Sequence, residues 1–355
     1  MDLEQQLGNL FILGFEGQEL LPGSRIERDI SENNLGGVIL FERCLHTPDL
    51  PGNITSPQQL KQLTSELQEC SPEKLLICVD QEGGLVQRLN SRNGFISTAS
   101  AADMGNAADG TAFTYVQAEQ TARMLAGAGI NINFAPVVDL NTNRDNPIIG
   151  RIGRSFSDDP ETVITQASAW IEAHDKYGIV SCLKHFPGHG SSTSDSHLGF
   201  VDITASWQEA ELRPYQELIS RGAVDLVMAG HLFNHHIDPI FPATLSHATI
   251  TGLLRQDLGF EGVVLTDDMQ MKGITDRYNL PEALCRSFAA GIDMIIIGNN
   301  LACDPAVLEN VSAAVGEGLR RGFVTEERLY SALDRVKKLK NLMQEKQHGR
   351  ESHNT

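Results

Sequence analysis

The chain has 355 residues, with 46 Asp and Glu against 28 Lys and Arg, so its formal net charge at pH 7 is −18. Hydrophobic residues make up 41% and charged residues 21% of the chain, which is close to the globular average and excludes disorder over most of its length. A surface this acidic repels nucleic acid and anionic lipid, so we expect neither as a partner.

The sequence favours a cytoplasmic protein. Acidic residues precede any basic residue at the start of the chain, unlike the basic head of a secretory signal. No apolar run approaches the roughly eighteen residues that a bilayer requires, so we expect no membrane partner. The six cysteines show no C-x-x-C spacing, which argues against both a disulfide framework and a structural zinc site. We therefore expect reduced thiols.

Eight short apolar runs have the length and composition of buried parallel strands. Eight strands that alternate with helices predict an α/β protein with a single (β/α)8 barrel of the TIM type, and a doubly wound open sheet is the alternative. The runs span Phe11–Phe15, Gly37–Phe41, Leu75–Val79, Ile132–Val138, Val180–Leu183, Leu226–Ala229, Gly262–Leu265 and Met294–Ile297.

Helix signals separate most of these runs. Ser56 is a candidate N-cap for a helix whose first turn contains Pro57. Ser206 and Glu209 have the spacing of a capping box, although Pro214 is expected to delay or kink that helix. Thr325 precedes a final amphipathic helix. No linker divides the chain, so we expect one barrel domain over residues 1–345 and a polar C-terminal tail over 346–355.

Polar residues stand at or just past the C-terminal end of every predicted strand. In a barrel these positions converge on one rim, where barrel enzymes place their chemistry. Any one of them could instead bond to loop backbone, but eight strand ends together favour a functional rim. The residues are Glu16, Glu42, Asp80, Asp139, Lys184, His185, His231, Asp267 and Asn299.

The segment LTDDMQM brings two carboxylates to the end of the seventh strand. Because side chains alternate along a strand, we expect only one of Asp267 and Asp268 to face the pocket. Asp267 could then be a nucleophile, a general base or a metal ligand. An ordinary role as a helix cap is the alternative.

The segment KHFPGHGSSTSDSH predicts a strand end at Lys184 and His185, followed by a mobile, lid-like loop. In that loop the Asp195 carboxylate is close enough along the chain to bond one ring nitrogen of His197. The bond would orient the imidazole and favour its protonated form, giving an acid and base active near neutrality. Zinc ligation by the loop histidines is disfavoured, because metal-dependent barrel hydrolases usually carry two histidines after their first strand.

Two further segments offer ligand-binding groups. In VDQEGGLVQRL, Asp80 reaches the rim and can accept hydrogen bonds from two neighbouring hydroxyl groups, while the glycine pair allows a tight turn that returns Arg88 to the same space. A surface salt bridge is the alternative for Arg88. In IIGRIGRSFSDDP, either Arg151 or Arg154 can supply cationic hydrogen bonds.

Taken together, the motifs resemble glycoside hydrolase family 3, and within it the β-N-acetylglucosaminidase branch. DQEGGxVQR, FAPVVDL, GRSFSDDP, KHFPGHG with DSH, MAGHL, PATLS and TDDM occur in order over roughly residues 7–342. The resemblance implies a (β/α)8 barrel, no metal or other cofactor, and a retaining two-step hydrolysis of terminal β-linked N-acetylglucosamine. The partner is then a small carbohydrate. The length is similar to that of bacterial cytoplasmic enzymes of peptidoglycan recycling, which act on muropeptides, and we expect a monomer.

Motif by motif, the resemblance also assigns roles. Asp267 resembles the nucleophile, and His197, paired with Asp195, resembles the general acid/base. If the acid lies on a flexible loop, an unliganded structure could hold His197 too far from Asp267 for catalysis. The residues that resemble sugar-binding positions are Asp80, Arg88, Arg154, Lys184 and His185.

Three further functions fit parts of the pattern. A phosphorylase on the same scaffold is one, because an imidazole acid does not repel incoming phosphate. A catalytically silent sugar-binding sensor is the second, although a sensor has no need of Asp267, Asp195 and His197 together. A metal-dependent amidohydrolase is the third, and activity that survives a chelator would exclude it.

Overall fold

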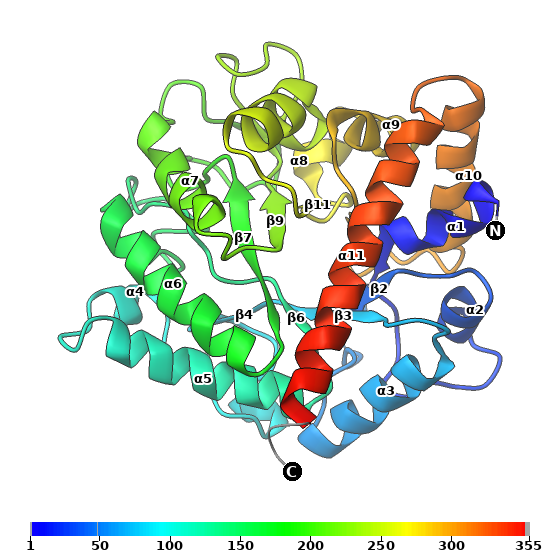
Figure 1. The fold of residues 1–355 in the computed structure, drawn as a ribbon, viewed down its shortest axis with the longest axis horizontal. Helices are drawn as coiled ribbons and strands as arrows, with labels where there is room; N and C mark the ends of the chain where they lie inside the picture. Colours follow the sequence, from blue (N-terminus) through cyan, green and yellow to red (C-terminus); the bar gives the residue numbers. More distant parts are fainter. Residues whose placement is uncertain (1, 48, 352–355) are drawn as a thin grey trace.

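The computed structural model describes residues 2–47 and 49–351, with side chains as far as Lys346. Within that part of the chain, eight strands pair in parallel into one sheet (Figure 1). They are β1 (Phe11–Leu13), β2 (Gly37–Ile39), β3 (Leu76–Val79), β6 (Ile132–Asn133), β7 (Val180–Phe186), β9 (Leu226–Ala229), β11 (Val263–Thr266) and β12 (Ile295–Ile297).

The sheet closes on itself. Its order is β11-β9-β7-β6-β3-β2-β1-β12, and a parallel bridge between Leu265 and Met294 joins the two outer strands. The predicted (β/α)8 barrel and its eight strands are confirmed, and the open doubly wound sheet is wrong. β6 is shorter than predicted, since Pro136 has no N–H to donate to a ladder. β7 is longer, because Lys184 and His185 are buried among acidic partners instead of ending the strand.

Helices surround the barrel in Figure 1. They are α1 (Leu3–Gln6), α2 (Arg25–Ser31), α3 (Pro57–Cys70), α4 (Ala101–Gly105), α5 (Thr111–Gly127), α6 (Pro160–Lys176), α7 (Arg213–Ser220), α8 (Lys272–Thr275), α9 (Leu280–Ala290), α10 (Val307–Arg320) and α11 (Glu326–Glu351), with the π-helical segment η5 (Ala248–Asp257) between β9 and β11. Short strands β4 (Gln81–Gly83) and β5 (Val86–Gln87) form a hairpin, and β8 (Val201–Asp202) pairs with β10 (Leu232–Phe233).

Two of the three predicted helix starts are confirmed. The Ser56 hydroxyl accepts a hydrogen bond from the Gln59 N–H at 3.2 Å, and the Thr325 hydroxyl accepts one from the Arg328 N–H at 3.2 Å. The predicted box at Ser206 and Glu209 is wrong. The reciprocal bonds are made by Gln208 and Glu211, two residues later, and Pro214 stands in the first turn of α7 as expected.

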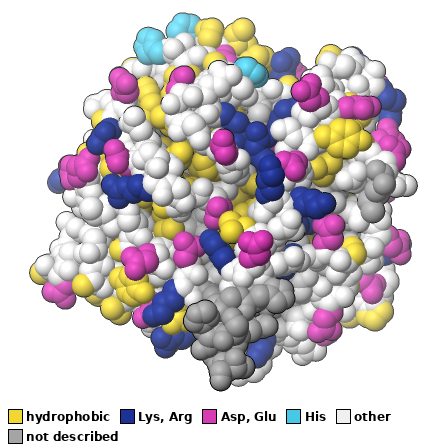
Figure 2. Space-filling view, viewed as in Figure 1, with side chains coloured by type: hydrophobic (Ala, Val, Ile, Leu, Met, Phe, Trp, Pro, Cys, Tyr) yellow, Lys and Arg dark blue, Asp and Glu magenta, His cyan; other side chains and the backbone are white. Residues whose placement is uncertain are grey.

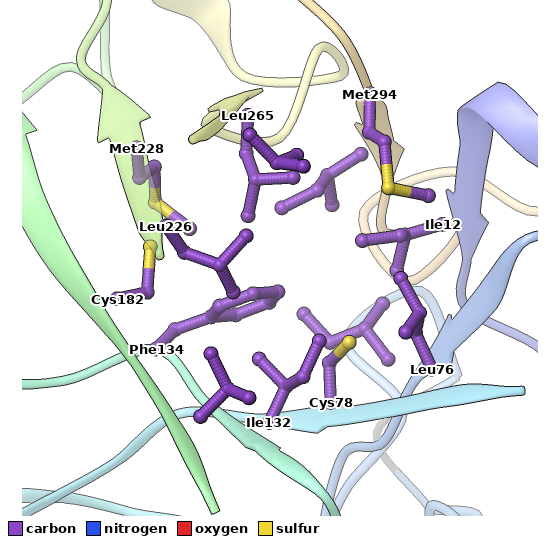
Figure 3. Close-up of a cluster of buried hydrophobic side chains, with 14 of the residues drawn as sticks. Ile12, Leu76, Cys78, Ile132, Phe134, Cys182, Leu226, Met228, Leu265 and Met294 are labelled. Atoms are coloured by element: carbon purple, nitrogen blue, oxygen red, sulfur yellow. The ribbon is translucent and has the colours of Figure 1, made fainter. Parts of the chain in front are cut away.

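Apolar side chains fill the inside of the barrel. Figure 3 shows Ile12, Leu76, Phe134, Leu226 and Leu265 pointing toward one another from five sides. All five are at most 1% exposed, so the interior is a packed core and not a channel. Truncating any one of them to alanine should cost roughly 2–5 kcal/mol of stability. A ligand must therefore bind at an end of the barrel.

α11 covers the N-terminal ends of the strands. Lys340 donates to Asn9, which precedes β1, at 3.0 Å, and Lys346 lies 3.4 Å from Asp225, which precedes β9. In Figure 1 the helix crosses in front of the sheet, and Figure 2 shows acidic and basic side chains interspersed on this face. The opposite, C-terminal rim is therefore the end left for a site.

α11 continues past residue 345, where the predicted barrel domain ends, and residues 352–355 of the predicted tail lie outside the described residues. The division of the chain at 345/346 stays a prediction. Across the described residues, no helix is both long and apolar enough to cross a membrane. Cytoplasmic location stays a prediction as well.

Candidate active site

Asp267 lies at the rim immediately after β11. Its N–H donates to the carbonyl of Ala229 at 3.0 Å, and its carboxylate accepts from the N–H of Asp268 at 2.8 Å. It borders a cavity whose wall also includes Asp80, Arg88 and His197. The predicted convergence of residues from distant strand ends on one rim is confirmed at this cavity.

The carboxylate of Asp267 is held in its charged form. Burial raises its pKa, but the nearby rings of His185, His231 and His197 outweigh that effect and lower the pKa to about 2. Asp267 is therefore a carboxylate ion that borders the cavity throughout the neutral range. Such a group can act as a nucleophile.

Asp268 differs from expectation, because both aspartates line the cavity. One carboxylate oxygen of Asp268 accepts from the N–H groups of Gln270 and Gly298, each at 3.0 Å. Burial, which outweighs these hydrogen bonds, raises its pKa to about 6. The Asp268 carboxylate thus ties the loop after β11 to the loop after β12, which separates its role from that of Asp267.

His197 and Asp195 form the predicted pair. The Nδ1 atom of His197 lies 2.9 Å from the Asp195 carboxylate, which also accepts from the His197 N–H at 2.8 Å. With Nδ1 engaged by the carboxylate, Nε2 is the nitrogen left to exchange a proton. The His197 side chain is 53% exposed and lines the same cavity as Asp267.

The loop that carries His197 is anchored at its base. His189 is buried, donates its N–H to Asp139 at 2.8 Å, and places its Nδ1 atom 2.8 Å from the Ser192 hydroxyl. Burial, followed by the charge of His185, lowers the pKa of His189 to about 4, so the ring is neutral. Farther along, the carbonyl of buried Ser196 accepts from the N–H of Gly273 at 2.9 Å. The loop's closing on a substrate stays a prediction.

A buried charge network borders the cavity. The Lys184 ammonium, only 2% exposed, donates to Asp80 and to Glu82, each at 2.7 Å. Arg154 grips the Glu82 carboxylate with two nitrogens, each at 2.8 Å. Burial disfavours every charge in this network, yet Arg154 and Lys184 still hold the pKa of Glu82 well below its usual range. Each ion is therefore stabilised only by its neighbours.

The network continues to the remaining predicted positions. His185 places Nδ1 2.7 Å from the Asp139 carboxylate, and Arg154 lies 3.3 Å from its Nε2. Arg88 lies 3.6 Å from Asp80. The structure thus brings together the five residues that resemble sugar-binding positions. Of the two candidate arginines, Arg154 belongs to this network, whereas the exposed Arg151 side chain pairs with the exposed Asp145.

Sequence reasoning missed Glu82. It is 5% exposed and joins Lys184 to Arg154, and the only hint of this role in the sequence was its place inside the DQEGG motif.

The alternative of zinc held by the loop histidines has too few free ligands, because His185 and His189 already bind protein groups through their rings.

A carboxylate ion and an oriented imidazole border one cavity at the C-terminal rim of a (β/α)8 barrel, which is the end where barrel enzymes place their catalytic groups. Comparison with known proteins places the chain more closely. Residues 3–339 match the model of the glycosyl hydrolase family 3 N terminal domain. The chain belongs to glycosyl hydrolase family 3, which confirms the resemblance read from its motifs.

Two relatives illustrate the match. A beta-hexosaminidase of Tolumonas auensis is 37% identical over 290 residues, which cover 80% of this chain and 82% of the relative. Beta-hexosaminidase A of Pseudoalteromonas piscicida is 32% identical over 336 residues, which cover 88% of this chain. The chain spans only about half of that second relative, 54% of its length.

Solved structures agree with the sequence comparison. A glycoside hydrolase family 3 β-N-acetylglucosaminidase from Paenibacillus sp. superposes with a TM-score of 0.86 at 33% identity, over 97% of this chain and 63% of that one. The β-N-acetylhexosaminidase of Beutenbergia cavernae superposes with a TM-score of 0.84 at 27% identity, over 96% of this chain and 99% of that one.

Proposed function

We propose that the chain is a retaining, exo-acting β-N-acetylglucosaminidase that hydrolyses terminal, non-reducing β-linked N-acetylglucosamine. The observation that carries the proposal is the shared cavity, which has the ionised Asp267 carboxylate and the Asp195-paired imidazole of His197 on its wall. The names of the hexosaminidase relatives support the choice of sugar.

The chemistry follows from the two groups. Asp267 attacks the anomeric carbon while the Nε2–H of His197 protonates the departing glycosidic oxygen, giving a glycosyl ester on Asp267. Water then attacks the same carbon as Nε2 takes its proton, and the carboxylate leaves. Each step inverts the anomeric centre, so the product keeps the β configuration. Asp195 stabilises the imidazolium form of His197, which exists before the first step and is regained when Nε2 takes the proton of the attacking water.

The network beside the cavity would hold the sugar. Asp80, whose carboxylate already accepts from Lys184, can accept from sugar hydroxyls, and Lys184 can donate to them. Because Glu82 and Asp139 fix Arg154, Lys184 and His185 in advance, little reorganisation is needed when the substrate binds. The fixed charges thus orient the ring so that its anomeric carbon faces Asp267.

The decisive experiment compares turnover of 4-nitrophenyl β-N-acetylglucosaminide with that of the plain β-glucoside. We expect at least a hundredfold preference in kcat/KM for the acetamido sugar, on the order of the discrimination that lost polar contacts give. Equal turnover of both, or none of either, contradicts the proposal. Binding of the sugar without turnover would identify the silent sensor.

Product analysis distinguishes a hydrolase from a phosphorylase and from an amidohydrolase. In phosphate buffer, a hydrolase releases free N-acetylglucosamine, whereas a phosphorylase releases the sugar 1-phosphate. Turnover after treatment with a chelator excludes the amidohydrolase. Muropeptides as the natural substrate form the finer part of the proposal, supported by the motif resemblance, and turnover of a purified muropeptide at least as fast as that of the nitrophenyl glycoside tests it.

A further inference from the structure

Four metal-binding side chains gather at the rim on loops that follow three neighbouring strands. These strands, β2, β1 and β12, are adjacent in the sheet, so the loops after them lie side by side. None of the four side chains has a role in the proposed hydrolysis. We call the group the rim cluster, and it consists of Glu16 after β1, Cys44 and His46 after β2, and Cys303 after β12.

Three members of the rim cluster already lie at ligand spacing. The Nε2 atom of His46 is 2.9 Å from the Glu16 carboxylate and 3.6 Å from the Cys44 sulfur, and that sulfur is 4.0 Å from the same carboxylate. Zinc bonded tetrahedrally to sulfur at ~2.3 Å and to nitrogen or oxygen at ~2.0–2.2 Å separates its ligands by about 3.4–3.6 Å. To admit the ion, the Glu16 oxygen would move away from Nε2 by about half an ångström, and the Cys44 sulfur, now 3.2 Å from Nδ1, would shift toward the Nε2 side of the ring.

The other ring nitrogen of His46 is also arranged as in metal sites. Its Nδ1 atom lies 3.1 Å from the carbonyl oxygen of Asn300. Metal-bound histidines generally donate their second N–H to a carbonyl or carboxylate, which fixes the tautomer and points the free nitrogen at the ion. Here that geometry directs Nε2 of His46 toward Glu16, while the Cys44 sulfur lies nearer to Nδ1, at 3.2 Å.

Cys303 lies outside the three ligand atoms that are within 4.8 Å of one another, and its thiol would move toward them to act as a fourth donor. Its thiol is exposed, and it donates a hydrogen bond to the Glu16 carboxylate and lies near Cys44. If both thiols ionised, the Glu16 carboxylate and the two thiolates would repel one another. A divalent ion between them would replace that repulsion with attraction and release the thiol protons to solvent.

We propose that the rim cluster is a binding site for a borderline-soft divalent cation of the zinc class, separate from the catalytic groups. Two sulfurs, one imidazole and one carboxylate suit Zn²⁺, whereas Mg²⁺ and Ca²⁺ prefer oxygen ligands. In the complex two thiolates and a carboxylate surround the ion, and two protons are lost.

Occupancy would brace one wall of the cavity that contains Asp267. Arg43 and Leu45, on either side of Cys44, line that cavity, and so do Asn300 and Leu301 shortly before Cys303. The Leu45 N–H already donates to the Asn300 side chain at 2.8 Å. The metal would join the same two loops through their cysteines.

Titration of the reduced, chelator-treated protein with Co²⁺ tests the proposal. We expect one equivalent to produce a thiolate-to-cobalt charge-transfer band and the intense visible bands of a tetrahedral site, and Zn²⁺ to abolish both. Cys44→Ser and Cys303→Ser should each weaken Co²⁺ binding at least tenfold. Because Cys303 is exposed, its variant is not expected to disturb folding.

Two control variants locate the site. Cys70→Ser removes a half-buried thiol on α3 and should leave the cobalt spectrum unchanged. Asp267→Asn should also leave it unchanged, which separates this proposal from metal binding at the catalytic groups. Three results would each overturn the proposed metal site: an octahedral cobalt spectrum without the thiolate band, cobalt bands that persist in both Cys44→Ser and Cys303→Ser, or cobalt bands that are lost in Asp267→Asn. Hydrolytic activity is not needed for any of these readouts.

Discussion

Aspartates with cationic or imidazole neighbours occur at both ends of the barrel, and they differ in what they leave open. At the N-terminal end, Asp293 is 0% exposed and its oxygens lie 2.5, 2.7 and 3.4 Å from Arg255, Arg328 and Arg335. At the C-terminal end, the Asp267 carboxylate accepts from one backbone N–H and borders a cavity. The oxygens of Asp293 are engaged by arginines of the fold, whereas the Asp267 carboxylate can still bind a ligand in the cavity.

This contrast separates charges that hold the fold together from charges that can do chemistry. Asp267 directly follows β11 and Asp293 precedes β12, and each lies near basic side chains. Only Asp267 combines such neighbours with an open cavity and an acid/base group on the same wall. The same substitution at the two ends should therefore affect different properties.

Asp267→Asn should have the largest effect. Loss of the nucleophile is expected to lower kcat/KM about 10⁴-fold or more, while the free energy of unfolding falls by only about 2 kcal/mol, because the lowered pKa of the carboxylate stabilises the fold by roughly that amount. Initial rates with the nitrophenyl substrate and urea denaturation measure the two quantities. Residual turnover within tenfold of the unsubstituted protein would mean that Asp267 is not the nucleophile.

His197→Ala should come next. Removal of a general acid is expected to cost about 10²–10⁴-fold on an alkyl glycoside, whose leaving oxygen needs a proton, and far less on the nitrophenyl glycoside in the glycosylation step. Single-turnover rates for the two substrates give the comparison. Equal losses on both leaving groups would assign His197 a different task.

Asp293→Asn should show the opposite behaviour to Asp267→Asn. Removing this charge leaves three arginines without their common partner, which is expected to cost about 3 kcal/mol of stability. The kcat of the folded fraction should not change, since the site is at the other end of the barrel. If Asp293→Asn instead lowered kcat strongly and left the free energy of unfolding unchanged, the two ends of the barrel would not differ in function as described.

Glu211→Gln should produce a smaller, pH-dependent gain in stability. Glu211 is 1% exposed near the base of the loop that carries His197, and burial raises its pKa from 4.5 to about 7. Between these values the folded state binds more protons than the unfolded state, so stability falls as the pH rises from about 4.5 to 7. Glutamine avoids the free-energy cost of ionising the buried carboxyl, which is about 3 kcal/mol above pH 7.

Thermal unfolding of the unsubstituted protein and of Glu211→Gln at pH 5 and pH 8 measures this gain in stability. Glu209→Gln, at an exposed position in the same turn, is the matched control. The gain in Tm from Glu211→Gln should be larger at pH 8. A gain that is the same at both pH values, or larger at pH 5, would show that Glu211 is not buried as a raised-pKa carboxyl.

The sequence predicted the barrel well because its strands are apolar on both faces and each ends in a polar residue. It predicted the end of β7 too early, since Lys184 and His185 look solvent-exposed until their partners Asp80, Glu82 and Asp139 are brought in from other strands. The capping box was misplaced by two residues for a similar reason, because Gln208 and Glu211 satisfy each other in a turn that the spacing alone does not distinguish.

The rim cluster was invisible in the sequence for the same physical reason. Cysteine spacing along the chain argued against a zinc site, but Cys44 and Cys303 are 259 positions apart and come near each other only because β1, β2 and β12 are neighbours. Motifs pointed to Asp267, Asp195 and His197 because the order of the motifs along the chain is fixed, and the structure brings Asp267 and His197 to one cavity. Contacts between loops of distant strands require the closed barrel.

Trapping the covalent intermediate would show whether Asp267 is the nucleophile of a retaining hydrolysis. Incubation with an activated 5-fluoro-N-acetylglucosaminyl fluoride, which slows the second step, should add one sugar to the protein, and mass spectrometry of its peptides should place that sugar on Asp267. A stable adduct on another residue, or rapid turnover of natural substrate with inversion and no adduct, would contradict a two-step displacement at Asp267.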